Sequence, residues 1–127
     1  SPGRRLTSNM APTVCRHEDG TVMAIGSPGA SRITTAIAQV LFNFISLDLP
    51  LRQAISHPRL HFEVFNNTPT IAFEGGLNVD ALNLTSRQFE GLSMYFGGVQ
   101  AALASPTNGL TAAADPRRTG GIAWGEN

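Results

Sequence analysis

A glycine-rich turn before a helical pattern is the segment of this sequence best suited to chemistry. Residues Gly26–Ser31 read Gly-Ser-Pro-Gly-Ala-Ser and directly follow a β-prone run. Backbone N–H groups at a helix N-terminus have no partner within the helix, so they can bind a phosphate, a carboxylate or a developing oxyanion. The turn lacks the Lys of a P-loop and matches neither GxGxxG nor GxSxG. It is therefore either a plain strand-to-helix turn or an anion or oxyanion site.

Three small polar residues, Thr7, Ser8 and Asn9, form a second candidate site just before an apolar strand. Their hydroxyl and amide donors suit a substrate carboxylate in a shielded pocket. The alternative is a turn in which Ser8 or Asn9 bonds its own backbone, and the local pattern alone favours that turn.

The histidines and the single cysteine give weaker signals. His57 and His61 are separated by Pro58, which breaks the one-helix face that HExxH-type zinc ligation requires. Cys15 can form neither an internal disulfide nor a CxxC pair, and we expect it to be a small buried apolar group. The sequence therefore predicts no metal site and no cofactor, and it leaves the redox compartment open.

The elements that position these residues follow from apolar periodicity and turn signals. Asp19-Gly20 between two β-prone runs predicts a hairpin of residues 13–14 with residues 21–25. Apolar residues at i, i+3, i+4 and i+7 predict a helix over Ile33–Leu47, and apolar groups on its other faces predict burial almost all round. A shorter helix begins at Leu49-Pro50 and stops at His57-Pro58.

The rest of the chain is predicted to hold strands and one more helix. A weak pattern of Val79, Leu82 and Phe89 favours this third helix over about residues 79–89. Turn signals predict strands over residues 60–65 and 70–73, and again over residues 99–104 and 110–114. Strands interspersed with a few helices indicate an α+β layered domain.

Composition excludes several functional classes. The 127 residues suffice for one domain, and 42% hydrophobic residues can fill its core. Nine arginines balance nine acidic residues, so the chain lacks the excess positive charge of a nucleic-acid or anionic-membrane surface. The densest apolar stretch, Ile33–Leu47, is interrupted by polar residues and is too short for a membrane span.

Four stretches, in order and over nearly the whole chain, resemble one known family, the γ-glutamyltranspeptidases. Residues 2–13 are similar to the family's PGKRPLSSMSPT segment, and residues 26–33 to its GSPGGSRI segment. Residues 53–61 are similar to EAV…APRFHH, and residues 112–121 to the closing AASDPRR-GG. The region of resemblance is the C-terminal part of the family's small subunit.

This resemblance implies an N-terminal-nucleophile hydrolase fold, an αββα sandwich of antiparallel sheets with flanking helices. In the family a precursor cuts itself to expose a catalytic Thr, and no segment here matches the Thr-Thr-His context of that nucleophile. Residues 1–127 are therefore interpreted as a single-domain fragment with a substrate-side loop over residues 1–12 and a tail over residues 119–127. Its implied partners are the remainder of the small subunit and the large subunit of the same precursor.

Four residues receive roles from the resemblance. The serine pair that binds the substrate α-carboxylate in the family corresponds to Ser8 and Asn9, and the paired glycines of the oxyanion hole correspond to Gly29 and Ala30. Asn9 has a longer, planar side chain, which suits a different acyl donor. Ala30 still supplies an N–H provided that its φ is not positive, because a Cβ makes the left-handed conformation costly. Leu6 replaces a Pro of the family motif.

The first hypothesis is therefore part of an enzyme that cleaves γ-glutamyl amides such as glutathione and passes the acyl group to water or an amine. The alternatives are a non-catalytic homologue acting as a binding or assembly module, and an acylase of the same superfamily with a non-glutamyl substrate. The sequence does not choose between hydrolysis and transpeptidation, and only the resemblance suggests a periplasmic or secreted location. Because flanking strands would be missing, we expect the isolated chain to form oligomers and to lack γ-glutamyl hydrolysis.

Overall fold

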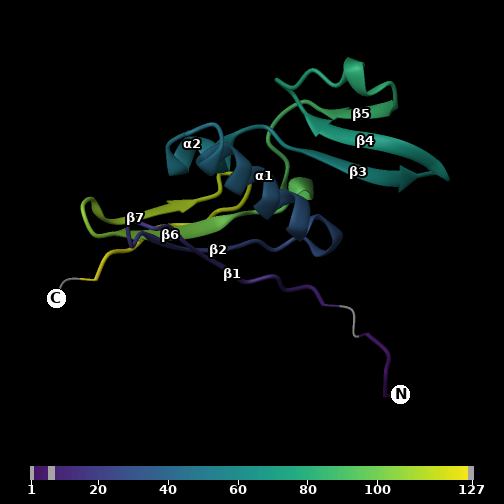
Figure 1. Cartoon of the computed structure of the whole chain (residues 1–127). Helices are drawn as coiled ribbons and strands as arrows, with labels where there is room; N and C mark the ends of the chain where they lie inside the picture. Colours follow the sequence, from purple (N-terminus) through teal and green to yellow (C-terminus); the bar gives the residue numbers. More distant parts are fainter. Residues whose placement is uncertain (1, 6–7, 126–127) are drawn as a thin grey trace.

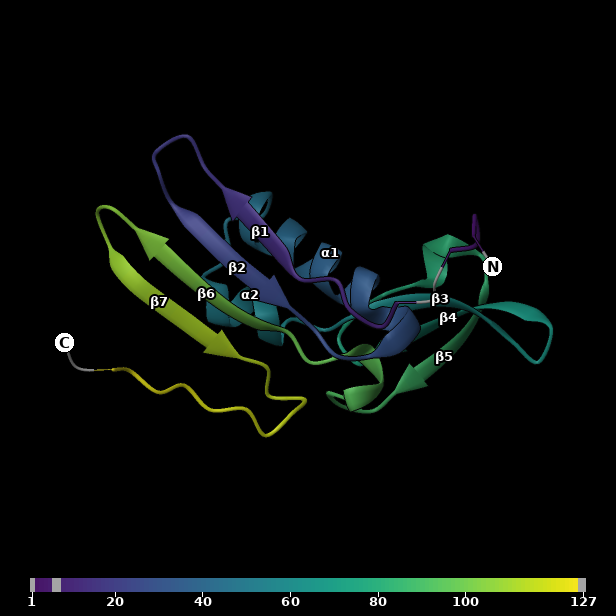
Figure 2. The same ribbon diagram turned by 90° about the horizontal axis from the view of Figure 1, so that it is seen from below.

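Two β-sheets and two α-helices make up the computed structural model, which describes residues 2–5 and 8–125. The first sheet has the strand order β1-β2-β6-β7 and is antiparallel; the second has the order β3-β4-β5 and lies beyond one end of the first (Figures 1 and 2). The strands are β1 (Thr13–Arg16), β2 (Val22–Gly26), β3 (Leu60–Phe65), β4 (Thr68–Glu74), β5 (Thr85–Phe89), β6 (Gln100–Ser105) and β7 (Gly109–Ala114).

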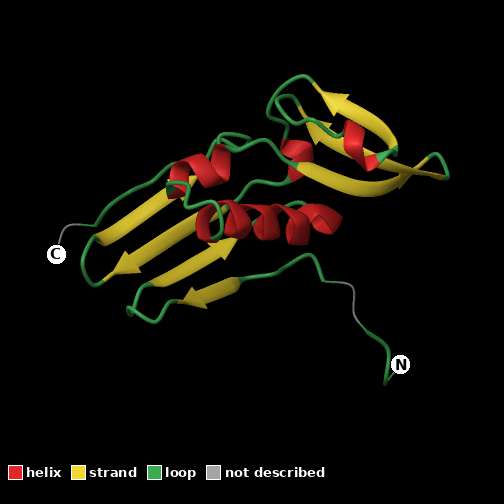
Figure 3. Cartoon of the chain, turned by 45° about the horizontal axis from the view of Figure 1, so that its top comes forward, coloured by secondary structure: helices red, strands yellow, loops and turns green. Residues whose placement is uncertain are grey.

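The helices α1 (Ile33–Ile45) and α2 (Leu51–Ser56) cover one face of the first sheet (Figure 3). Period-two alternation along β2 turns Met23 and Ile25 toward them, where Val40 and Ile55 are fully buried. The other face of the sheet is open, and its Val14 side chain is 72% exposed. One layer of helices on one sheet therefore holds the main core.

The predicted hairpins are confirmed. In the β1–β2 turn, Thr21 N donates to Asp19 Oδ1 at 2.8 Å, and Gly20 has a φ of +89°. Asn66 and Asn67 form the β3–β4 turn with φ values of +48° and +61°, which Asn tolerates better than other residues that carry a Cβ. Because this turn needs only two residues, β4 begins earlier than predicted, at Thr68.

The predicted helix over residues 33–47 is observed over Ile33–Ile45, but its expected burial on all sides is wrong. Phe42, Ile45 and Leu47 are 58%, 65% and 50% exposed, whereas Val40 on the sheet side is fully buried. In the described part of the chain the helix contacts the first sheet, α2, the turn before it and the start of β3. Its outer face at Phe42 and Ile45 remains exposed. No helix within residues 2–5 and 8–125 is long and apolar enough to cross a membrane.

The predicted third helix over residues 79–89 is wrong. A single 3-10 turn, η2 (Asp80–Leu82), ends at Asn83 with a φ of +50°, and β5 follows. Residues of β5 pair in parallel with β4, where Arg87 lies opposite Ala72. Pairing with a preformed strand outweighs the weak helical pattern. This is the one parallel pairing among the described strands, and Val79 instead packs with Ile71 and Phe73 in a small second core.

Candidate functional site

The glycine-rich turn joins the end of β2 to α1 (Figure 2). A 3-10 turn, η1 (Ala30–Arg32), leads into the helix, and Arg32 N donates to Gly29 O at 3.0 Å. Neither the Gly29 amide nor the Ala30 amide donates a hydrogen bond to any residue that the structure describes. Two adjacent N–H groups are thus available at the head of a helix, as an oxyanion site requires.

Ala30 has a left-handed backbone, with a φ of +51°. The sequence-based expectation was that Ala30 supplies its N–H provided that its φ is not positive. That condition is not met. The left-handed conformation costs a residue with a Cβ about 1–2 kcal/mol, whereas the φ of +134° at Gly29 is open to glycine. Such strain persists only where surrounding contacts impose it, and it concentrates at functional sites.

The segment that precedes β6 supports the turn from outside. Ser27 Oγ accepts a hydrogen bond from Gly98 N at 3.1 Å and donates one to Pro28 O at 2.8 Å. The two backbones approach so closely that a Cβ on Gly97 would lie 2.7 Å from Ser27 Oγ and 3.0 Å from Pro28 O. Gly97 also has a φ of +87°, so only glycine fits at this position.

Four buried charged side chains, called here the ion quartet, lie where the two sheets meet. Arg59 precedes β3, Glu74 ends β4, and Asp115 and Arg117 follow β7. Arg59 Nη2 donates to Asp115 Oδ2 at 2.7 Å, and Arg117 Nε donates to Glu74 Oε1 at 2.8 Å. Arg117 also pairs with Asp115 at 3.2 Å, and all four side chains are at most 1% exposed. Each buried charge therefore has a partner of opposite sign.

The ion quartet fixes the segment that supports the turn. Its side chains bond backbone atoms on both sides of Gly97: Arg59 Nη1 donates to Phe96 O at 3.1 Å, Ser93 N donates to Glu74 Oε1 at 2.7 Å, and Val99 N donates to Asp115 Oδ2 at 2.7 Å. The quartet therefore holds residues 93–99 in place. Gly97 and Gly98 of this segment in turn contact the Gly29 turn at Ser27 and Pro28.

The charges in the quartet affect the two arginines differently. Burial lowers the pKa of Arg59, and the positive charge of Arg117 lowers it further. Burial would also lower the pKa of Arg117, but the hydrogen bond and charge of Glu74 outweigh it and raise that pKa. Neither arginine has a role predicted from the sequence, although both lie in segments that resemble family motifs. That resemblance was the available signal.

The arm that carries Ser8 and Asn9 is an extended segment leading to β1 (Figure 1). Ser8 Oγ donates to Met10 O at 3.1 Å and accepts from Met10 N at 3.2 Å, which is the local turn weighed as the alternative. Both Ser8 and Asn9 are exposed. No hydrogen bond among the described residues links this pair to Gly29 or Ala30. Leu6 and Thr7 lie outside the described residues.

The three histidines occupy separate environments. His17 pairs with Asp19 at 3.0 Å on the β1–β2 turn, and His61 Nδ1 lies 3.0 Å from Thr35 Oγ1 at the start of α1. His57 Nδ1 lies 3.1 Å from the carbonyl of Pro58. No group of three or more His, Cys, Asp or Glu residues that could hold a metal is found in the described part of the chain.

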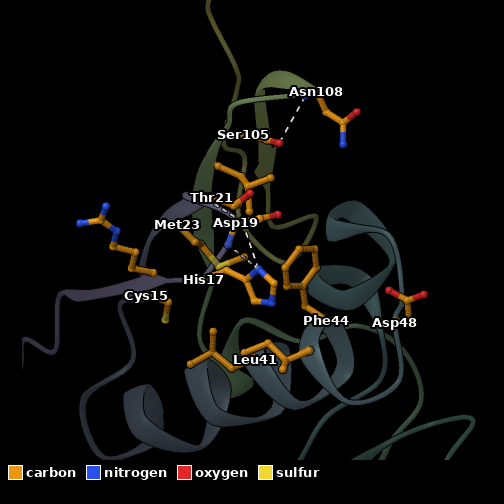
Figure 4. A pocket seen from close by; sticks show the side chains of 13 residues that line it. Cys15, His17, Asp19, Thr21, Met23, Leu41, Phe44, Asp48, Ser105 and Asn108 are labelled. Atoms are coloured by element: carbon orange, nitrogen blue, oxygen red, sulfur yellow. Dashed lines mark hydrogen bonds and ion pairs between the residues drawn. The ribbon is translucent and has the colours of Figure 1, made fainter.

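A cavity of about 480 Å³ lies at the opposite end of β2 from the Gly29 turn (Figure 4). Met23, Leu41 and Phe44 form its apolar wall, while His17 and Asp19 contribute polar atoms. Cys15 also lines it and is half-buried rather than buried as expected. None of the residues expected at the site lines this cavity.

Comparison with known proteins settles the family. The family model described as gamma-glutamyltranspeptidase matches residues 1–125. The chain belongs to the γ-glutamyltranspeptidase family. A glutathione hydrolase proenzyme of Pseudomonas sp. (strain A14) is 32% identical, and the capsule biosynthesis protein CapD proenzyme of Bacillus anthracis is 34% identical. The alignments cover 98% and 99% of this chain but only 23% and 24% of those relatives.

Solved structures of the same family share the fold. The γ-glutamyltranspeptidase of Pseudomonas nitroreducens complexed with L-DON is 29% identical with a TM-score of 0.76, covering 99% of this chain and 67% of that chain. The CapD transpeptidase of Bacillus anthracis is 32% identical with a TM-score of 0.76, covering 99% of this chain and 75% of that chain. The predicted α+β class and the N-terminal-nucleophile hydrolase architecture are thereby confirmed.

Proposed function

We propose that this chain supplies the oxyanion hole of a γ-glutamyl hydrolase or acyltransferase that cleaves amides such as glutathione. The observation that carries the proposal is the pair of available amides at Gly29 and Ala30, held at the head of α1. Attack on the γ-carbonyl places negative charge on its oxygen, and two fixed N–H donors stabilise that charge without reorganising. One such donor contributes about 2.7–4 kcal/mol to lowering the barrier.

Ser8 and Asn9 bind the α-carboxylate of the substrate in this proposal. A hydroxyl and a primary amide both donate hydrogen bonds to a carboxylate. Among the described residues Ser8 bonds Met10 alone, its near neighbour, so it can exchange those local bonds for a substrate oxygen without breaking a long-range contact seen there. Because Asn9 has a longer side chain than the serine of the family motif, the preferred acyl donor should be determined by comparing several γ-glutamyl amides.

The nucleophile is supplied by a segment outside these 127 residues. No part of this sequence matches the Thr-Thr-His context of the family nucleophile. We therefore expect this chain to show no γ-glutamyl hydrolysis by itself, and a longer protein that carries it to show that activity. A longer protein that binds γ-glutamyl compounds without cleaving them would favour the non-catalytic alternative.

The chain is also expected to associate when isolated. The open face of the first sheet has Val14 and Leu110 72% and 69% exposed, and the outer face of α1 exposes Phe42 and Ile45. Such apolar surface is unusual on a monomer and favours contact with the rest of a precursor or with other copies. Light scattering at micromolar concentration tests this, because a monomer of 13.5 kDa would contradict it.

Removal of a single amide tests the proposed oxyanion hole directly. Replacing Ala30 by lactic acid in the longer protein converts its N–H to an ester oxygen and leaves the side chain unchanged. We expect kcat for a γ-glutamyl anilide to fall about 10²–10³-fold. The matched control is the same replacement at Ala123, an exposed tail residue, which should leave kcat unchanged. Equal activity of the two esters would remove Ala30 from the oxyanion hole.

A further inference from the structure

Arg32 links the strained turn to the segment before β6. Its Nε donates to Tyr95 O at 3.1 Å, and its guanidinium lies 4.3 Å from the centre of the Tyr95 ring. Tyr95 belongs to η3 (Met94–Phe96), the 3-10 turn directly before Gly97. One side chain thus fixes the distance between the turn that carries Ala30 and the segment that supports it, through a hydrogen bond and a cation–π contact.

Tyr95 is in turn fixed to the second sheet. Its hydroxyl donates to Glu63 of β3, which also pairs with Arg87 of β5 at 2.7 Å. The Tyr95 ring stacks on Phe89 with centroids 5.0 Å apart and meets Phe96 edge-on. Tyr95 therefore cannot follow Arg32 if the turn relaxes, so the contact holds the turn rather than moving with it.

We propose that Arg32 and Tyr95 are positioning residues, called here the Arg32 clamp, that keep Ala30 in its left-handed conformation and so aim its N–H at the oxyanion. A residue with a Cβ gains about 1–2 kcal/mol by leaving the left-handed region, so Ala30 needs an external restraint. Gly at the same position would not need it, because glycine adopts positive φ freely. The inference rests on the proposed function for its catalytic consequence only.

A double-mutant cycle between Arg32 and Ala30 tests the clamp in the longer protein. Arg32→Met keeps an unbranched apolar stem and removes the guanidinium with its charge and donors. We expect it to lower kcat about 10–100-fold with KM within twofold, because a misaligned donor acts on the transition state. In the Ala30→Gly background the same substitution should lower kcat less than about threefold, a coupling that a merely structural arginine would not produce.

Two further variants grade the effect of Arg32→Met, and a third serves as the control. Arg32→Lys retains the charge but loses the Nε donor, so its kcat should lie between those of the parent and Arg32→Met. Arg52→Met is the matched control, because Arg52 is an exposed arginine of α2, and its kcat should equal that of the parent. Tyr95→Phe keeps the ring and the carbonyl, so it should lower kcat less than Arg32→Met does.

A readout without catalysis separates the clamp from the proposed function. In the labelled protein, the HN–Hα coupling and the Cα and Cβ chemical shifts of residue 30 report its φ. Arg32→Met should move Ala30 out of the left-handed region, whereas Arg52→Met should not. If φ moves but the parent cleaves no γ-glutamyl substrate, the clamp stands and the proposed function fails. An unchanged φ, or equal kcat losses in the parent and Ala30→Gly backgrounds, overturns the clamp.

Discussion

The Gly29 turn and the Ser8 arm both resemble family motifs, but different contacts hold them. The turn is held by residues far along the chain, since Ser27 bonds Gly98 and Arg32 bonds Tyr95. Within residues 2–5 and 8–125, Ser8 hydrogen-bonds only Met10. Donors for a developing charge gain most from being fixed before reaction, whereas a group that binds the remote end of a substrate can adjust on binding. The difference matches the two roles proposed for them.

The ion quartet should give the largest effect, because the support of the turn depends on it. Arg117→Met leaves Glu74 and Asp115 buried with one positive partner, and we expect unfolding to need about 3–5 kcal/mol less free energy. Urea denaturation followed by circular dichroism measures this. Arg52→Met, on the exposed side of α2, should change the free energy by less than about 0.5 kcal/mol. Similar losses for the two variants would show that the quartet does not hold the fold together.

Gly97→Ala should give the next largest effect and acts on the turn itself. The new Cβ would meet Ser27 Oγ and Pro28 O, and the residue would keep a φ of +87°. Strain and overpacking together should lower the free energy of unfolding by about 2–4 kcal/mol. Gly121→Ala is the control, since a Cβ there has open space. A tolerated Gly97→Ala would mean that the two backbones separate easily, and the contrast with the arm would weaken.

Local signals in the sequence predicted most of the elements. In the β1–β2 turn, the Asp19 side chain accepts a bond from the backbone of Thr21 and Gly20 takes a positive φ. Ile33, Ile37 and Val40 are spaced so that they lie on one buried face of α1. These features depend on residues close in the chain, so a pattern suffices. The prediction of a third helix over residues 79–89 was wrong because β5 is stabilised by pairing with β4, and no local pattern contains that partner.

The site was predictable only in part. The resemblance proposes Gly29 and Ala30 as oxyanion-hole candidates, but nothing in the sequence indicated the left-handed φ of Ala30. The Arg32–Tyr95 contact beside it joins residues 63 positions apart, which no local pattern contains. The ion quartet combines residues 59, 74, 115 and 117. The resemblance covers the segments of three of them, but their pairing is visible only after the two sheets are placed together. Long-range charge pairing leaves no periodic trace along a chain.

Ser8→Ala sharpens the comparison from the side of the arm. If Ser8 binds the α-carboxylate, its loss should raise KM for a γ-glutamyl anilide by an amount equal to roughly 1–3 kcal/mol, with kcat little changed. Ser105→Ala is the matched control, because in the described chain the hydroxyl of Ser105 also bonds only nearby residues, Thr107 and Asn108, and the substitution should leave KM unchanged. An unaltered KM for Ser8→Ala would return Ser8 to the role of a turn residue.

The smallest effect should be a pH dependence at the start of α1, where His61 meets Thr35. Burial lowers the pKa of His61 below its usual 6.5, and the charge of Arg32 lowers it further, while Glu63 opposes the shift. The unfolded chain therefore binds a proton more readily than the folded one. His61 contributes stability that is complete above pH 6.5 and is lost as the pH falls from 6.5 toward its folded pKa.

Urea titrations between pH 8 and pH 5 measure this contribution, because the free energy of unfolding should fall with pH in the parent and fall less in His61→Gln. Arg32→Met should reduce the slope without abolishing it, since the burial of His61 remains after the charge is removed. The same slope in the parent and in His61→Gln would show that protonation of His61 is not coupled to folding. The contact of His61 with Thr35 would then not make the stability of this region depend on pH.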